Sequence, residues 1–313
     1  MRKKCTNQIY ELAKKSSKVI YLGSDLTPNL IPKMIKKYPS RYFMEGISEA
    51  NLVGVAAGLA LEGFIPYVQT IATFITRRCF EQLAVDVCLH NLPVRLIGNG
   101  GGLVYTPLGP THLAIEDISI MRSLPNMTVV AVSDEIEMSK LMNQTLSWKG
   151  PIYIRLGKGG DPIISKGKNF KIGRGVVYEI SKNRNFDYVF FSTGIMTETC
   201  IRIANKLKSL GKSCVVIHLH TIKPLDEQLI LKYTRIAKRI VIVEEHSVVG
   251  GLFSAVNEFT TKAYATKKIL SLPPVDNYGI PDKFPEGYGK QLDMLKKLGL
   301  SYEGILKEIM SKN

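Results

Sequence analysis

Short runs of apolar residues alternate with segments of helical periodicity along the chain. In the first half these runs cover residues 19–23, 64–70, 93–98, 127–132 and 151–157. Between them lie helical segments, such as the one that ends at the histidine of "VDVCLH", in which apolar residues recur at spacings of three and four. Apolar strands separated by helices are typical of a parallel sheet covered on both faces. The first half is therefore predicted to be a doubly wound α/β domain.

A change of composition divides the chain near its middle. Residues 157–175 contain six glycines and several lysines, which interrupt the alternation. After this segment the alternation of apolar runs and helical segments resumes and continues to the end of the sequence. We therefore predict two α/β domains, at residues 1–160 and 185–313, joined by a linker at residues 161–184.

Composition is typical of a globular protein. Of the 313 residues, 45% are hydrophobic and 22% are charged. No uninterrupted apolar run reaches the length of about 18 residues that a transmembrane helix needs. The basic N-terminal segment lacks the apolar core of a secretory signal and is predicted to be an amphipathic helix. The five cysteines form no CxxC pair. These features predict a cytoplasmic protein with reduced thiols and no membrane segment.

The net charge of +15 would suit a nucleic acid or another anionic partner. However, the lysines are scattered over helical segments and form no compact cluster interleaved with aromatic residues. This distribution favours solvated helix faces, and nucleic-acid binding is not predicted.

An acidic residue opens the most apolar helical segment. Residues 52–61 are small and apolar, as in a helix buried on every side, yet Glu49 precedes them directly after Ser48. Ser48 is a suitable N-cap and the helix dipole favours an acid in the first turn, so helix-start chemistry alone would explain the pair. The small side chains that follow would also let a flat ligand approach one helical face: Gly54, Ala56, Ala57, Gly58 and Ala60. Glu49 is therefore a candidate binding group.

Two further segments carry candidate site residues. Phe74, Arg77 and Phe80 recur every three residues where a strand turns into a helix, which is where open α/β sheets place ligand sites. Packing against a core would explain the aromatic residues equally well. His112 lies just before a helix, at the end of a long Gly- and Pro-rich loop of the kind that is usually functional. The sequence contains no metal-ligand spacing, nucleophile elbow or P-loop.

Four spaced motifs resemble the C-terminal half of transketolase, in the form whose two halves are separate polypeptides. They are "RYFMEGISEANLVGVAAGLALEGFIPYVQT", "ATFITRRCFEQL", "GPTHLAIEDISIMRSLPNMTVV" and the run from "IKPLDEQLI" to "RIVIVEEHSVVGGLFSAV". They follow in order across nearly the whole chain. The resemblance implies a pyrimidine-binding domain for thiamine diphosphate, with a mainly parallel sheet, followed by a smaller transketolase C-terminal α/β domain.

The resemblance also implies cofactor-binding roles. Glu49 matches the catalytic glutamate that hydrogen-bonds N1′ of the cofactor's aminopyrimidine ring and so activates the cofactor. Phe74 matches the aromatic residue that lies against this ring, with Arg77 and Phe80 at neighbouring family positions. Asp25 resembles an acid near the cofactor, in a motif that is one residue short.

Substrate-binding roles are implied for two residues. His112 matches the catalytic histidine that contacts substrate oxygens and helps to move protons, and Arg155 falls near the family's phosphate-contacting arginine. Two positions depart from the family pattern. Leu108 stands where most transketolases have an aspartate implicated in recognising a hydroxyl of the donor sugar, and Ala50 replaces the usual His or Gln. These departures predict a specialised sugar substrate.

A partner chain is implied by a motif that the sequence does not contain. In the family, a "GDG...N" segment of a separate domain holds the diphosphate through a divalent metal such as Mg²⁺ or Ca²⁺, and no GDG triplet occurs here. The resemblance therefore implies a partner subunit that carries this motif and the metal, in an α2β2 heterotetramer. The implied activity is transfer of a two-carbon ketol unit between sugars or sugar phosphates.

Other functions remain open. A 1-deoxyxylulose-5-phosphate synthase normally carries all domains on one chain, and the β subunit of a 2-oxo acid dehydrogenase lacks the "GPTHxxIEDI" run. A catalytically silent regulatory homologue is disfavoured by the intact Glu49 and His112, but Leu108 leaves it open.

Overall fold

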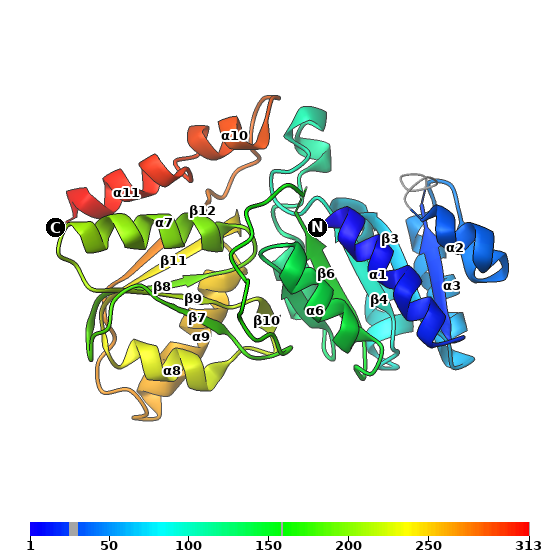
Figure 1. Cartoon of the computed structure of the whole chain (residues 1–313), viewed down its shortest axis with the longest axis horizontal. Coiled ribbons are helices and arrows are strands. Elements are labelled where there is room, and N and C mark those ends of the chain that lie inside the picture. Colours follow the sequence, from blue (N-terminus) through cyan, green and yellow to red (C-terminus); the bar gives the residue numbers. More distant parts are fainter. Residues whose placement is uncertain (25–30, 158, 313) are drawn as a thin grey trace.

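The computed structural model describes residues 1–24, 31–157 and 159–312, which form two α/β lobes lying side by side (Figure 1). A seven-stranded sheet forms the centre of the N-terminal lobe, and a five-stranded sheet forms the centre of the C-terminal lobe. Both sheets are mainly parallel. The predicted class of two doubly wound α/β domains is therefore confirmed.

The seven-stranded sheet has the order β10-β5-β6-β4-β3-β1-β2, and β10 runs antiparallel to β5. Its strands are β1 (Val19–Gly23), β2 (Tyr42–Met44), β3 (Ile65–Ile71), β4 (Arg95–Asn99), β5 (Thr128–Ala131), β6 (Ile152–Leu156) and β10 (Thr221–Lys223). The helical elements of this lobe are α1 (Arg2–Lys15), α2 (Pro32–Lys37), η1 (Pro39–Arg41), α3 (Glu49–Leu61), η2 (Phe74–Arg78), α4 (Phe80–Gln82), η3 (Leu83–Cys88), η4 (Thr106–Leu108), η5 (Pro110–His112), α5 (Asp117–Ser123) and α6 (Glu135–Thr145).

The five-stranded sheet has the order β12-β11-β8-β9-β7, and β7 is antiparallel to β9. Its strands are β7 (Val176–Glu179), β8 (Phe186–Ser192), β9 (Cys214–His218), β11 (Ala237–Ser247) and β12 (Val275–Ile280). The helices of this lobe are α7 (Met196–Ser209), α8 (Glu227–Thr234), α9 (Leu252–Ala265), α10 (Gln291–Lys297) and α11 (Tyr302–Ser311). Because β7 belongs to this sheet, part of the segment predicted as linker is a strand of the C-terminal lobe.

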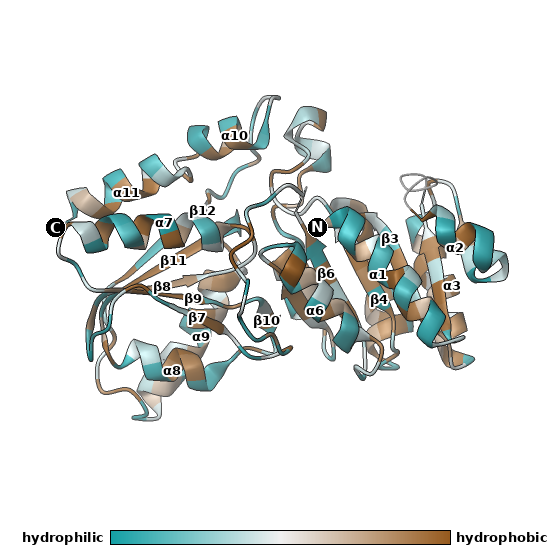
Figure 2. Ribbon diagram, in the orientation of Figure 1, coloured by the Kyte–Doolittle hydropathy of each residue, from teal (hydrophilic) through white to brown (hydrophobic). Residues whose placement is uncertain are grey.

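Both faces of the seven-stranded sheet are buried, which explains why its strands are apolar throughout. Along β1, Val19 and Tyr21 join the core that lies under α1 and α6, whereas Ile20 and Leu22 join the core that lies under α3. Successive side chains of a strand point to opposite faces, so a strand covered on both sides needs an apolar residue at each position. Figure 2 shows the consequence: the strands are largely brown, whereas α1 and α7 alternate between teal and brown.

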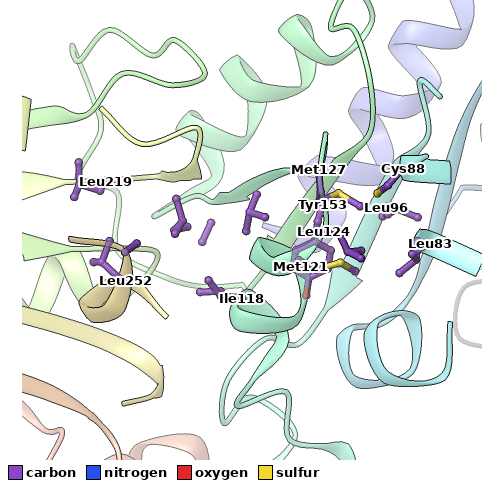
Figure 3. Close-up of a cluster of buried hydrophobic side chains, with 14 of the residues drawn as sticks. Leu83, Cys88, Leu96, Ile118, Met121, Leu124, Met127, Tyr153, Leu219 and Leu252 are labelled. Carbon is purple, nitrogen blue, oxygen red and sulfur yellow. The ribbon is translucent and has the colours of Figure 1, made fainter. Parts of the chain in front are cut away.

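The two lobes share part of one hydrophobic core. A cluster of buried side chains extends from Leu83 and Cys88 of η3, through Ile118 of α5, to Leu219 and Leu252 of the C-terminal lobe (Figure 3). Strand β10 strengthens the connection, since it follows β9 in the sequence but pairs with β5 of the other sheet. The strand and the shared core together hold the C-terminal lobe against α5.

The helix predicted between β3 and β4 departs from regular α-helical geometry. Elements η2 and η3 are π-helical, and a short α-helical turn, α4, lies between them. A π turn contains more residues than an α turn, so a spacing of three no longer places side chains on one face. Phe74, Arg77 and Phe80 consequently have different neighbours, as described below.

A buried histidine in the interface between the lobes predicts acid sensitivity. His220 is fully buried and its ring stacks on Phe170, with the centroids 4.1 Å apart. Burial lowers the pKa of His220 from 6.5 to about 4. Below pH 6.5 the unfolded chain therefore binds a proton that the folded chain does not, and stability falls as the pH falls. We expect a loss of about 2 kcal/mol between pH 6.5 and pH 5 in urea unfolding experiments.

A His220→Gln variant should lose much less stability over the same pH interval. The neighbouring Glu137 does not interfere, because its contribution lies at lower pH. Burial acts to raise the pKa of Glu137, but the His218 ring lowers it to about 2, so this contribution is lost only below pH 4.5. An equal pH dependence in the wild type and the variant would contradict the role of His220.

Candidate functional site

Three predicted site residues lie at the carboxyl edge of the seven-stranded sheet. Glu49 begins α3 shortly after β2, Phe74 begins η2 just after β3, and His112 ends η5 in the loop that follows β4. Strands β3 and β4 are neighbours, and β1 separates β3 from β2. Because all these strands are parallel, their carboxyl ends meet at one edge, which is where open α/β sheets bind ligands.

Contacts join these residues into one group through a residue that the sequence did not single out. Glu49 is 2% exposed, and its Oε2 accepts a hydrogen bond of 2.5 Å from Nη1 of Arg78. The Arg78 guanidinium carbon lies 4.7 Å from the centroid of the Phe74 ring. That ring in turn meets the His112 ring edge to face, with centroids 5.3 Å apart. Glu49, Phe74, Arg78 and His112 are called the Glu49 cluster below.

The start of α3 differs from the expected helix-start chemistry. Ser48 occupies the N-cap position, but its side chain makes no capping bond and instead donates to Glu45 at 3.0 Å. The carboxylate of Glu49 pairs with Arg78 from a different element. Side-chain capping by Ser48 is therefore absent, whereas Glu49 still lies in the first turn, where the helix dipole favours an acid. The binding role of Glu49 stays a prediction.

Helix α3 is also less enclosed than its composition suggests. Ala56, Ala57 and Ala60 are buried, whereas Val55 and Leu61 are exposed. Of the glycines on this helix, Gly54 is half-buried and Gly58 is exposed, so the small residues do not all lie on one face. The expectation of a helix buried on every side is wrong for this chain, because its outer face has no covering element among the described residues.

Two threonine side chains fix the histidine of the loop. Thr73 donates its hydroxyl to the carbonyl oxygen of His112 at 3.0 Å, and the Thr111 hydroxyl lies 2.9 Å from His112 Nδ1. With Nδ1 engaged, Nε2 is the nitrogen that can exchange a proton with a ligand. Gly109 permits the tight path of this loop: its φ is 79°, and a β-carbon there would lie 2.8 Å from the ring of Tyr288.

The other aromatic and basic residues of the predicted set do not join the cluster. Arg77 forms an ion pair with Glu116 and donates to the carbonyl oxygen of Leu113 at 3.1 Å, so it ties η2 to the segment that follows His112. Phe80 is 39% exposed. Asp25 lies outside the described residues, and its role stays a prediction.

Arg155 forms a buried ion pair within the N-terminal lobe and also contacts the C-terminal lobe. Its Nε donates to Asp117 at 2.8 Å, and its Nη2 donates to the carbonyl oxygens of Ala114 at 3.2 Å and Glu245 at 2.8 Å. Burial acts to lower the pKa of Arg155, but the Asp117 carboxylate raises it above its ordinary value. The phosphate contact predicted for Arg155 stays a prediction. In this structure its guanidinium is bonded to the Asp117 carboxylate and to two carbonyl oxygens.

A cavity of about 320 Å³ lies beside the loop that carries Leu108. Leu108 is half exposed and lines this cavity together with Asn99 and Tyr105. Asn99 is buried and accepts from Gln69 at 2.9 Å, while its Nδ2 has no hydrogen-bond partner among the described residues. Sequence reasoning missed Asn99, whose only signal was its position at the end of a strand.

The described residues contain no preformed metal centre and no membrane-spanning helix. Among residues 1–24, 31–157 and 159–312, no group of three or more His, Cys, Asp or Glu side chains is placed to hold a metal ion. Within the same described residues, every helix is too short or too polar to cross a bilayer. The five cysteines are buried and free.

Comparison with protein families identifies the class of protein. Residues 1–160 match the model described as transketolase, pyrimidine binding domain, and residues 178–305 match transketolase, C-terminal domain. The chain therefore belongs to the transketolase family, and this family implies binding of thiamine diphosphate.

Individual relatives make the similarity more specific. A Methanocaldococcus jannaschii protein, provisionally named a transketolase C-terminal section, is 33% identical over 100% of this chain and 96% of its own length. The "6-deoxy-6-sulfo-D-fructose transketolase subunit" of a Clostridium species is 31% identical over 96% of this chain and 90% of its own length. A solved split-gene transketolase, described as an inactive beta4 tetramer, shows a TM-score of 0.86 and 32% identity over 99% of this chain and 96% of that chain.

Other curated relatives are longer than this chain. The 1-deoxy-D-xylulose-5-phosphate synthase of Caldanaerobacter subterraneus is 32% identical over 96% of this chain, but the match covers 47% of that protein. The chain thus spans about half the length of these synthases.

Proposed function

We propose that the chain is one subunit of a thiamine-diphosphate-dependent, transketolase-like enzyme that transfers a two-carbon ketol unit between sugars or sugar phosphates. The Glu49 cluster is the observation that carries this proposal. It gathers a buried carboxylate, an aromatic ring and a loop histidine from three separate elements at the carboxyl edge of one sheet. These side chains are the ones that the family assigns to the cofactor ring and the substrate.

The cluster fits a flat, nitrogen-containing ring. Glu49 offers a buried carboxylate for a ring nitrogen, and Phe74 offers an aromatic face that already holds a planar cation, the guanidinium of Arg78. When bound, thiamine diphosphate would supply a carbon nucleophile and an electron sink for breaking and forming the carbon–carbon bond.

The chain's own residues would position the cofactor ring and the substrate, and would hold or move protons. Glu49 would hold a proton at N1′ of the aminopyrimidine, in a position where water is largely excluded by burial. Phe74 would orient the ring by contact with its face. His112, fixed through Thr73 and Thr111, would bind substrate oxygens and move protons through Nε2.

An exposed apolar surface beside the cluster supports the proposal of a separate partner subunit. Large apolar side chains are exposed around the open face of α3 and on η3, which packs against α3: Ile47, Val55, Leu61, Val85 and Leu89. On the same helix Gly54 and Gly58 leave open space above the backbone. Exposed apolar side chains on neighbouring elements are a feature of protein interfaces. We propose that a subunit with the "GDG" motif covers it, holds the diphosphate through Mg²⁺ or Ca²⁺, and completes an α2β2 assembly.

The names of two relatives support the same arrangement. One is called a transketolase subunit, and the split-gene transketolase is described as inactive when it is a tetramer of its beta chain. The test is to co-express this chain with a neighbouring reading frame that encodes a "GDG" motif, purify the complex and measure ketol transfer. Transfer by the complex, with none by either chain alone, is the expected result. A chain that transfers ketol units without the partner would contradict the split site.

A second candidate is a 1-deoxyxylulose-5-phosphate synthase activity, which the relatives of that name favour at 32–34% identity. The two functions differ in product, because the synthase forms 1-deoxyxylulose 5-phosphate. Formation of that product by the complex, without ketol transfer between sugars, would favour the synthase.

The leucine at the position of the family aspartate predicts a change in donor preference. Leu108 is half exposed, so replacement by aspartate should cost little stability. We expect Leu108→Asp to lower the KM for ordinary hydroxylated ketose phosphate donors about tenfold, because the carboxylate would accept a hydrogen bond worth about 1.4 kcal/mol. KM and kcat for a donor series measure the effect, and Leu108→Asn tests whether charge is required. If the ranking of donors by kcat/KM were the same in the wild type and in Leu108→Asp, the assignment of Leu108 to donor recognition would be wrong.

A further inference from the structure

Arg78 makes two contacts at once within the Glu49 cluster. Its Nη1 donates to the buried Glu49 carboxylate at 2.5 Å, and its guanidinium lies 4.7 Å from the centre of the Phe74 ring. These are the same two groups that the proposed function assigns to the cofactor's aminopyrimidine, one as hydrogen-bonding partner and the other as stacking surface. The guanidinium and the aminopyrimidine are both planar and nitrogen-rich, so one can substitute for the other.

We propose that Arg78 is a positioning residue that occupies the aminopyrimidine position and has to move aside when the cofactor ring binds. This inference rests on the proposed function. Before the cofactor arrives, the positive charge of Arg78 compensates the buried carboxylate of Glu49, which has no other charged partner among the described residues. The guanidinium of Arg78 also covers one face of the Phe74 ring.

The exposure of Arg78 makes its displacement feasible. The Arg78 side chain is 45% exposed, whereas the Glu49 side chain is 3% exposed. The arginine can therefore move its charge into solvent at small cost, while the carboxylate stays in place. A structural ion pair would instead be expected to keep both partners fixed during cofactor binding.

The C-terminal lobe offers a matched control arginine. Arg202 is 53% exposed, lies 3.8 Å from the Glu198 carboxylate, and covers the Tyr302 ring at 4.4 Å. It thus reproduces the carboxylate and aromatic contacts of Arg78 on a different lobe, where no site is proposed. Arg202→Met removes the same kinds of contact without touching the Glu49 cluster.

The experiment measures cofactor affinity in the co-expressed complex. Thiamine diphosphate with Mg²⁺ is titrated by calorimetry into complexes that contain the wild-type chain, Arg78→Met, Arg78→Lys or Arg202→Met. We expect Arg78→Met to lower Kd about tenfold, equivalent to about 1.4 kcal/mol, because the competing guanidinium is gone. Arg78→Lys keeps the charge but not the planar group, so its Kd should lie between those of the wild type and Arg78→Met. Arg202→Met should have the Kd of the wild type.

Separate outcomes test this inference and the proposed function. An unchanged or weaker affinity in Arg78→Met, with normal binding by the wild type, overturns the role of Arg78 and leaves the proposed function standing. A purely structural role predicts this weaker affinity, since the site would lose order. Absence of thiamine diphosphate binding by the wild-type complex overturns both. If Arg78→Met does not fold, Arg78→Gln makes the same comparison, because it also removes the charge.

Discussion

Replacing Glu49 by glutamine is expected to reduce ketol transfer by about a thousandfold in the complex with the partner subunit. Glutamine keeps the size of the side chain and can still form hydrogen bonds, but it cannot hand over a proton. General acid–base groups contribute about 10² to 10⁴ in rate, and this residue is proposed to act on the cofactor itself. Steady-state measurement of kcat, at saturating thiamine diphosphate, reports the loss.

A carboxylate at the other end of the same helix provides the control. Glu62 is the C-cap residue of α3 and is exposed, so Glu62→Gln should leave kcat within about twofold of the wild type. Thermal unfolding of both variants shows whether the fold is intact. If Glu49→Gln retained kcat in a folded complex, cofactor activation by this carboxylate would have to be abandoned.

Much of the fold could be predicted because strands that are buried on both faces form continuous apolar runs in the sequence. The run at 19–23 coincides with β1, and β4 and β6 lie within the ranges predicted for them, apart from the last residue of β4. Strand β10 could not be predicted in the same way. It is short, and it pairs with β5, a strand far earlier in the chain, which is a contact that no local pattern encodes.

The candidate site could be predicted only in part, because some of its contacts also depend on the three-dimensional structure. Glu49, Phe74 and His112 are predicted by motifs, and the structure brings them together. The motif did not indicate Arg78, because its significance depends on the π-helical turn that places it between Glu49 and Phe74. The exposed face of α3 also misled the sequence prediction, since an apolar helix looks the same whether its own chain or a partner covers it.

The largest effect on stability is expected from the buried ion pair between Asp117 and Arg155. Asp117 Oδ2 accepts from Arg155 Nε at 2.8 Å and from the Tyr153 hydroxyl at 2.7 Å, and the two charged side chains are 0% and 8% exposed. Asp117→Ala removes the carboxylate that the buried Arg155 guanidinium and the buried Tyr153 hydroxyl both hydrogen-bond. We expect a loss of about 3–5 kcal/mol in urea unfolding at neutral pH.

The consequence should extend beyond stability, because Arg155 of this pair also contacts the C-terminal lobe and Asp117 follows the segment that carries His112. Arg155 also donates to Glu245 of the C-terminal lobe, and Asp117 follows directly on Glu116, the partner of Arg77. Loss of the pair should therefore loosen the segment that carries His112 as well as the contact between lobes. Glu198→Ala, which breaks a surface pair on α7, should cost less than about 1 kcal/mol. A similarly small cost for Asp117→Ala would mean that this ion pair is not needed for stability beside the shared hydrophobic core and strand β10.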